Sequence, residues 1–344
     1  MALRIAAFLI LLHGALSTAL FAMSYPELIE KMRGFQESRI LLTAVELDVF
    51  TAVGQGATAG AVAQKINTHE RATEMLLNAL VAIGALKKSD GVFHNTPETS
   101  TYLVAGSPDY ARPSLMHIVN MFNSWATLTG SVRKGTAVVP PGVDRQEQEW
   151  TESFIAAMHS VAEGTAANLV RSVGTDGVRR LLDVGGGSGA YSIAFVKADP
   201  ELRADLLDLA SVVPLARKYT QEAGVADRIS FKVGDLRTGE LGKDYDLVLL
   251  SAICHMLSPE ENRDLFRRSY SALAKGGRIV IRDFILEPDK TAPKRAALFA
   301  INMLVGTQAG SSYSEVEYRQ WLTEAGFRDF RRPEPDGDLI VATR

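Results

Sequence analysis

Residues 181–190 read Leu-Leu-Asp-Val-Gly-Gly-Gly-Ser-Gly-Ala. The apolar start of this stretch has the composition of a buried strand, and the glycines that follow permit a tight turn and a close approach of the backbone to a ligand. A helix that begins after such a loop presents unpaired N–H groups to the same ligand. The stretch therefore predicts a strand, a ligand-binding loop and a helix, in that order.

Strand-like and helical runs alternate on the C-terminal side of this loop. After Arg180 to Val184, the strand-like runs are Ala204 to Leu209, Ile229 to Val233, Leu247 to Leu250 and Arg278 to Ile281. Such alternation is typical of a parallel sheet covered by helices on both faces, as in a Rossmann-like α/β fold. Two further strand-like runs near the C-terminus, Phe327 to Arg331 and Leu339 to Thr343, are separated only by the turn Pro333 to Gly337. They predict a closing antiparallel hairpin.

Helical patterns dominate the N-terminal part of the chain. An apolar face that contains Leu41 and Val45 is followed by predicted helices at Thr58 to Ile66, with Thr58 as the cap, and at His69 to Gly84. Short strands then flank the turn Ser89-Asp90-Gly91. Helices followed by a hairpin predict a winged-helix arrangement.

A winged helix also allows a DNA-binding interpretation, which requires cationic and amide side chains on the third helix. Between His69 and Ala85 the one strong cation is Arg71, whereas Met75, Leu77 and Leu80 are apolar. Burial of this domain against a partner subunit is therefore favoured over DNA binding.

Composition and charge narrow the classes of partner and compartment. The net charge is −3 and the sequence pI is about 6.1, which gives no electrostatic surplus for nucleic acid or an anionic membrane. The single cysteine, Cys254, excludes an intramolecular disulfide and a cysteine-based zinc cluster. We therefore expect a cytoplasmic protein without nucleic-acid or membrane partners.

The first 22 residues have two interpretations. Arg4, the apolar run Ile5 to Leu12 and the small residues up to Ala22 have the layout of a signal peptide. Alternatively, Met23 is the natural start, because an amphipathic helical pattern opens directly after it. We favour the second interpretation, since the lone cysteine agrees with an intracellular protein.

Three carboxylates stand at the ends of successive predicted strands. Asp183 would repel a pyrophosphate but attract the ammonium group of a methionyl moiety. Asp208 can accept hydrogen bonds from ribose hydroxyls. Asp235 with its neighbour Leu236 can hold an adenine ring, although a turn or helix-cap aspartate is the alternative. The set favours S-adenosylmethionine (SAM), while the G-x-G-x-x-A spacing of the loop keeps a nicotinamide cofactor as the rival.

His255 follows the predicted strand that ends near Leu250. Residues just past the carboxyl ends of strands in an open sheet face the ligand crevice. A histidine side chain titrates near neutrality, which suits a general base that removes a proton from a hydroxyl. A structural histidine bonded to a nearby carbonyl is the alternative at this position.

Taken together, these motifs resemble the class I SAM-dependent O-methyltransferases of the caffeate and acetylserotonin type. The resemblance extends from Met23 to the C-terminus and is carried by Leu182 to Gly189, Asp208, Gly234-Asp235, Ile253-Cys254-His255, Gly276 to Ile281 and Glu324 to Phe327. It implies a winged-helix dimerisation domain, homodimers, SAM as cofactor and no metal.

The resemblance also implies roles for individual residues. His255 matches the catalytic base and Asp283 an acidic residue that steers it. The implied cofactor residues are Asp183, Gly185, Gly187, Asp208, Leu209, Asp235, Leu236 and Ser251, and the implied acceptor-pocket residues are Met158, Asn302 and Met303. Met256 departs from an aspartate usual in the family, Ser312 from a second steering glutamate and Ser251 from a lysine.

We therefore predict a methyltransferase in which His255, oriented by Asp283, deprotonates an acceptor hydroxyl, and we expect this hydroxyl to be the phenol of a small molecule. The predicted divisions are an extension at 1–22, a dimerisation domain at 23–110, a helical region at 111–172 that contributes to the acceptor pocket, and a SAM-binding catalytic domain at 173–344. Alternatives are an N- or C-methyltransferase, a nicotinamide oxidoreductase and a non-catalytic SAM- or DNA-binding regulator.

Overall fold

The computed structural model describes residues 23–139, 148–333 and 337–344. The chain forms two compact units, Met1–Tyr110 and Ala111–Arg344. The two interpretations of residues 1–22, the paired prolines at 140–141 and the centre of the predicted turn at 334–336 lie outside the described residues. Within the described ranges, each helix is too short or too polar to span a bilayer.

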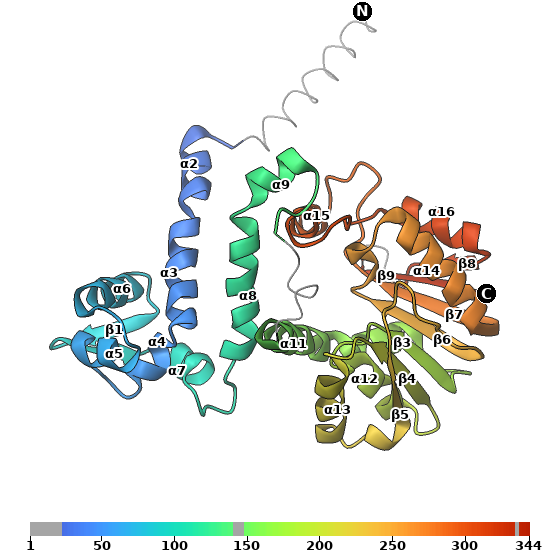
Figure 1. Cartoon of the computed structure of the whole chain (residues 1–344), viewed down its shortest axis with the longest axis horizontal. Coiled ribbons are helices and arrows are strands. Elements are labelled where there is room, and N and C mark those ends of the chain that lie inside the picture. Colours follow the sequence, from blue (N-terminus) through green and yellow to red (C-terminus); the bar gives the residue numbers. More distant parts are fainter. Residues whose placement is uncertain (1–22, 140–147, 334–336) are drawn as a thin grey trace, which may run out of the picture. The chain divides into compact units, whose positions relative to one another are not determined.

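The first unit consists of helices and one hairpin (Figure 1). Thr58 caps the helix that the sequence predicts there, because its hydroxyl accepts a hydrogen bond from the N–H of Ala61 at 3.3 Å. Asp90 and Gly91 both adopt positive φ in the hairpin turn. The elements are α2 (Tyr25–Arg33), α3 (Phe35–Glu46), α4 (Val49–Val53), α5 (Ala59–Lys65), α6 (Glu70–Ala82), β1 (Leu86–Ser89), β2 (Val92–Asn95) and α7 (Pro97–Leu103).

The described residues of the second unit begin with the helices α8 (Arg112–Trp125), α9 (Leu128–Lys134) and α11 (Gln148–Val173). The sheet follows, with its strands in the spatial order β5-β4-β3-β6-β7-β9-β8. Its strands are β3 (Arg180–Val184), β4 (Arg203–Asp208), β5 (Ile229–Val233), β6 (Tyr245–Ser251), β7 (Leu273–Arg282), β8 (Arg328–Arg331) and β9 (Leu339–Thr343). The first five are parallel, and β9 pairs antiparallel with both β7 and β8, which confirms the predicted closing hairpin.

Helices cover both faces of this sheet, as predicted (Figure 1). Alternate residues of β6 point to opposite faces: Leu247 and Leu249 join one apolar cluster, and Val248 and Leu250 join the other. The first cluster includes residues of α11, α12 (Ala190–Ala198) and α13 (Val213–Glu222), and the second includes residues of α14 (Pro259–Ala272) and α16 (Glu315–Ala325). The two remaining elements near the strand ends are η2 (Cys254–Met256) and α15 (Lys294–Gly306).

β6 and β7 are longer than the sequence pattern predicts: β6 spans Tyr245–Ser251 rather than Leu247 to Leu250. β7 begins at Leu273 rather than at Arg278, and Leu273 pairs with Tyr245 across a register shift. The polar and glycine residues Lys275 to Gly277 hide this extension, because they interrupt the apolar run.

Candidate active site

The glycine loop lies tightly packed at the carboxyl end of β3. Gly185 has φ of +67°, and a Cβ added there would lie 2.4 Å from Cδ1 of Ile253. Its N–H donates to the carbonyl oxygen of Leu207 at 2.7 Å. Both the backbone angle and the lack of space therefore require glycine at this position.

Asp208 joins the loop to the end of β4. Its Oδ2 accepts the N–H of Gly187 at 2.8 Å, and its Oδ1 accepts the N–H of Leu209 at 2.7 Å. Burial raises the pKa of Asp208 even though both backbone hydrogen bonds act in the opposite direction. The structure thus brings together three of the residues that the sequence assigns to the cofactor.

Asp183 is almost fully buried, with 1% of its surface exposed, at the end of β3. Ser192 of α12 donates a hydrogen bond to its Oδ2 at 2.7 Å. Burial is the main cause that raises the pKa of Asp183 to about 6, and the nearby Asp208 adds to the effect. A cation placed beside these two carboxylates would offset the cost of burying them, so the site fits a ligand with an ammonium group.

Asp235 lies in a turn after β5. Its Oδ1 accepts hydrogen bonds from the N–H of Arg237 at 2.8 Å and from Nε of Arg237 at 3.2 Å. These bonds outweigh partial burial and lower the pKa of Asp235. The turn role that the sequence allows for Asp235 is therefore present, and its contact with a cofactor stays a prediction.

Arg268 of α14 binds the loop that follows β5 and carries Asp235. Its guanidinium donates to the carbonyl oxygen of Leu236 at 2.7 Å and to that of Gly239 at 3.0 Å. No local sequence signal identifies this contact, because β6 and η2 separate α14 from the loop along the chain. The loop that carries Asp235 and Leu236 is thus held by a side chain that sequence reasoning missed.

The segment after β6 carries strain and an unpaired polar atom. Ala252 has φ of +57°, an unusual value for a residue with a Cβ. The Oγ atom of Ser251 is buried and has no hydrogen-bond partner among the described residues. A buried hydroxyl normally finds a partner, so Ser251 is suited to a polar group of a ligand.

His255 lies in η2 and forms a close pair with Asp283, the residue after β7. Nδ1 of His255 lies 2.6 Å from Oδ1 of Asp283, and the backbone N–H of His255 donates to Oδ2 at 3.0 Å. Oδ1 also accepts the N–H of Phe284 at 2.8 Å. The two residues are 6% and 3% exposed, so the pair is shielded from water.

Aromatic side chains border the imidazole of His255. The ring of Phe299 lies edge-on at 4.8 Å and that of Phe284 at 5.9 Å, measured between ring centroids. Phe284 and Phe299 stack on each other at 3.6 Å. No sequence pattern predicts this arrangement, because α15 and the segment after β7 meet only in the folded chain.

The predicted acceptor-pocket residues lie on two helices. Met158 of α11 is half-buried, and Met303 of α15 is buried. The side-chain oxygen of Asn302 accepts a hydrogen bond from Nε1 of Trp125 at 2.9 Å, which ties α15 to α8. Ser312, the residue in place of a second steering glutamate, donates its hydroxyl to the carbonyl oxygen of Ala296 at 2.9 Å.

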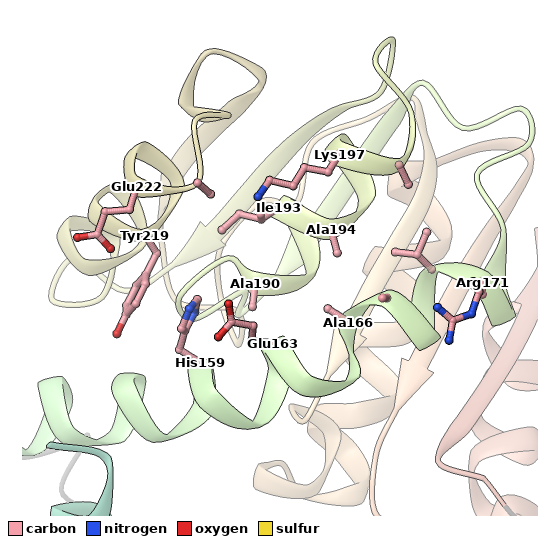
Figure 2. Close-up of a pocket in the computed structure, with 14 residues that line it drawn as sticks. His159, Glu163, Ala166, Arg171, Ala190, Ile193, Ala194, Lys197, Tyr219 and Glu222 are labelled. Carbon is pink, nitrogen blue, oxygen red and sulfur yellow. The ribbon is translucent and has the colours of Figure 1, made fainter. Parts of the chain in front are cut away.

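A separate groove of about 700 Å³ lies among α11, α12 and α13 (Figure 2). His159 stacks on Tyr219 at one end of it, with ring centroids 3.9 Å apart. Nδ1 of His159 lies 2.9 Å from the hydroxyl of Ser188, which belongs to the glycine loop. The remaining lining residues come from the helices, so this groove is distinct from the strand ends that carry the carboxylates.

Comparison with known proteins identifies both parts of the chain. An O-methyltransferase domain matches residues 135–328, and an O-methyltransferase dimerisation domain matches residues 29–105. The 3-hydroxy-5-methyl-1-naphthoate 3-O-methyltransferase of Streptomyces sahachiroi is 35% identical over 319 residues, which cover 90% of this chain and 92% of that protein.

Two solved structures share the whole architecture. PigF with SAH, a SAM-dependent methyltransferase from a Serratia strain, superposes with a TM-score of 0.85 at 27% identity and covers 93% of this chain and 99% of its own. Human N-acetylserotonin methyltransferase in complex with SAM gives a TM-score of 0.78 at 25% identity, with 94% of this chain and 98% of its own covered.

These matches favour SAM over the nicotinamide cofactor that the glycine spacing alone left open, and an enzyme over a non-catalytic regulator. The chain belongs to the SAM-dependent O-methyltransferase family, with an N-terminal dimerisation domain and a C-terminal catalytic domain that acts on small molecules.

Proposed function

We propose that this O-methyltransferase acts on a phenolic hydroxyl of a small aromatic molecule, with His255 as the general base and Asp283 as the group that orients it. The observation that carries the proposal is the 2.6 Å contact between Nδ1 of His255 and Oδ1 of Asp283. A carboxylate at that distance holds the proton on Nδ1 and leaves the lone pair on Nε2.

Nε2 of His255 has no hydrogen bond to the described residues, so it is available to an acceptor hydroxyl. As the proton moves to Nε2, the imidazole becomes positive and Asp283 stabilises that charge. When bound, SAM supplies the activated methyl group on its sulfonium. The low exposure of the pair strengthens this electrostatic stabilisation, because water does not screen it.

The aromatic neighbours of His255 support a planar, phenolic acceptor. Phe284 and Phe299 present apolar surface beside the base, and such rings pack favourably against an aromatic ligand. The name of the Streptomyces relative describes methylation of the 3-hydroxyl of a naphthoate, which is an acceptor of this chemistry.

We further propose that SAM is held at the carboxyl ends of β3, β4, β5 and β6. The buried carboxylate of Asp183 receives the ammonium group, and Asp208 receives the ribose hydroxyls. Asp235 and Leu236 take the adenine, and Ser251 offers its unpartnered hydroxyl. Gly185, Gly187 and Leu209 supply backbone around the ligand.

A homodimer through the N-terminal unit is supported by apolar side chains on α2 and α3. Tyr25, Met32 and Phe35 are 76%, 63% and 58% exposed, and α2 buries no side chain. Exposed apolar surface of this kind is typical of an interaction site. Sedimentation velocity tests the proposal: a monomer for wild-type protein at micromolar concentration would contradict it.

The proposed base role is tested with His255→Ala. Turnover of a naphthol acceptor is expected to fall by about 10²–10³-fold, while SAM affinity, measured by calorimetry, stays within about threefold. His255→Gln serves as a control that keeps the size of the side chain. Unchanged turnover in both variants would exclude the base role, and methylation of an aliphatic amine in preference to a naphthol would exclude the phenolic acceptor.

A further inference from the structure

We propose that Tyr318 is a positioning residue for the His255–Asp283 pair, because its hydroxyl fixes the orientation of the Asp283 carboxylate. This inference rests on the proposed role of His255 as base. It adds a residue from α16 to the two residues of the pair.

The contact is direct and buried. The hydroxyl of Tyr318 donates a hydrogen bond to Oδ2 of Asp283 at 3.2 Å, and Tyr318 is 0% exposed. Oδ2 also accepts the backbone N–H of His255, whereas Oδ1 accepts Nδ1 of His255 and the N–H of Phe284. Asp283 thus has four donors, and among the described residues Tyr318 is the one side chain besides the imidazole that bonds to it.

The ring of Tyr318 cannot move easily. It packs against Trp321, Tyr313 and Phe266, with ring centroids 6.0, 6.1 and 6.4 Å away. A hydroxyl held by such a cluster keeps its place while the proton is transferred. It therefore prevents the carboxylate from rotating and keeps Oδ1 in line with Nδ1 of His255.

The other titratable groups near Asp283 stay neutral. Burial raises the pKa of Cys254, of Tyr313 and of Tyr318, and Asp283 itself contributes to each increase. Glu261 of α14 and Glu317 of α16 also act on Tyr313. Ser312 bonds to the carbonyl oxygen of Ala296 and does not serve the pair. Tyr318 is therefore the group outside the pair that controls how Asp283 acts on His255.

The test compares Tyr318→Phe with Tyr313→Phe. Both tyrosines belong to the same buried aromatic cluster, but the hydroxyl of Tyr313 donates to the carbonyl oxygen of Leu257. The readouts are kcat across pH, SAM affinity and melting temperature. A merely structural role would lower the melting temperature in both variants and leave the pH profile unchanged.

We expect Tyr318→Phe to lower kcat by about tenfold and to move the acidic limb of the pH–rate profile downward by about half a pH unit. The limb moves down because a carboxylate that is free to rotate away from Nδ1 holds the protonated imidazole less strongly, so the neutral, active form of the base persists to lower pH. SAM affinity is expected to stay within about twofold, since Tyr318 does not contact the glycine loop. Tyr313→Phe is expected to keep the wild-type profile.

Three outcomes overturn the inference. The first is a Tyr318→Phe variant with the wild-type kcat and pH profile; the second is an equal shift of the profile in Tyr318→Phe and Tyr313→Phe. If Tyr318→Phe does not fold, Tyr318→Met, which also lacks a donor, is measured in its place and the same two outcomes apply. The third is wild-type turnover in His255→Ala, which would overturn the base role itself; loss of turnover there with no effect at Tyr318 would overturn the role of Tyr318 alone.

Discussion

Two buried aspartates in the catalytic unit differ in how completely the protein satisfies them. Asp283 accepts four hydrogen bonds from described residues, whereas the side-chain bond to Asp183 comes from Ser192. Burial raises the pKa of Asp183 to about 6. Asp283 is thus organised by the fold, and we infer that a cationic ligand would complete the surroundings of Asp183. Substitutions at the two positions should separate turnover from cofactor binding.

The largest effect is expected at Asp283. In Asp283→Asn, the negative charge that stabilises the protonated imidazole is lost, and the amide NH₂ group would face the backbone N–H of His255 or of Phe284, so at least one hydrogen bond is lost as well. We expect kcat to fall by about 10²–10³-fold, as in His255→Ala, with SAM affinity within about threefold. Steady-state kinetics and calorimetry on the same preparation check both values, and a parallel loss of SAM binding would break the contrast with Asp183.

The second effect is expected at Asp183. In Asp183→Asn, a neutral amide replaces the carboxylate that we assign to the ammonium group of SAM. The dissociation constant of SAM should rise about 100-fold, which corresponds to a loss of about 3 kcal/mol of binding free energy. The free protein should be more stable, because an increase of the pKa from 3.8 to about 6 corresponds to a cost of roughly 3 kcal/mol at neutral pH.

The melting temperature without ligand measures this gain in stability. A lower melting temperature together with unchanged SAM binding would mean that Asp183 is a structural residue. Ser192→Ala is the matched control, since it removes the hydrogen bond to Asp183 but keeps the charge. It should lower the stability and leave most of the SAM affinity.

The pH dependence of SAM binding sharpens the same comparison. Asp183 loses its charge as the pH falls through about 6, so SAM affinity should weaken by up to about tenfold per pH unit below that value. Stability changes in the opposite direction: between about 6 and 3.8 the folded state binds more protons at Asp183 than the unfolded state, and this contribution to the free energy of unfolding rises as the pH falls. Calorimetry from pH 5 to 8 checks the first trend. Asp183→Asn should bind weakly at every pH, and a wild-type affinity that is constant across this range would contradict the assignment.

The sequence indicates most clearly the candidate residues at the carboxyl ends of strands. Asp183 and Asp208 lie at the ends of β3 and β4, His255 lies shortly after β6, and the parallel sheet brings these strand ends to one edge. The pattern of apolar runs does not predict the order of the strands in the sheet. It does predict that helices cover both faces of the sheet and that an antiparallel hairpin closes it.

Residues that support these groups from a distance could not be predicted. Ser192, Phe299 and Tyr318 lie on helices whose patterns indicate only burial. Ser192 and Tyr318 bond to aspartates 9 and 35 positions away, and the ring of Phe299 contacts a histidine 44 positions away. Nothing in a helical period specifies which buried side chain meets a carboxylate. Such contacts depend on the tertiary packing of α12, α15 and α16 against the sheet.

The smallest effect is expected at Arg268, which tests whether SAM binding depends on a side chain that holds the loop after β5 from another helix. Arg268→Lys replaces a planar group that donates to the carbonyl oxygens of Leu236 and Gly239 with a single ammonium, so the loop that carries Asp235 should loosen. We expect the dissociation constant of SAM to rise about fivefold, the cost of about one hydrogen bond, with kcat unchanged at saturating SAM. Arg267→Lys is the matched control, because Arg267 lies one position away, is 62% exposed and bonds to Asp264. Equal effects in the two variants would indicate a general effect of replacing an arginine on α14. An effect at Arg268 alone would mean that the loop that carries Asp235 is held in place before SAM arrives, much as Asp283 is.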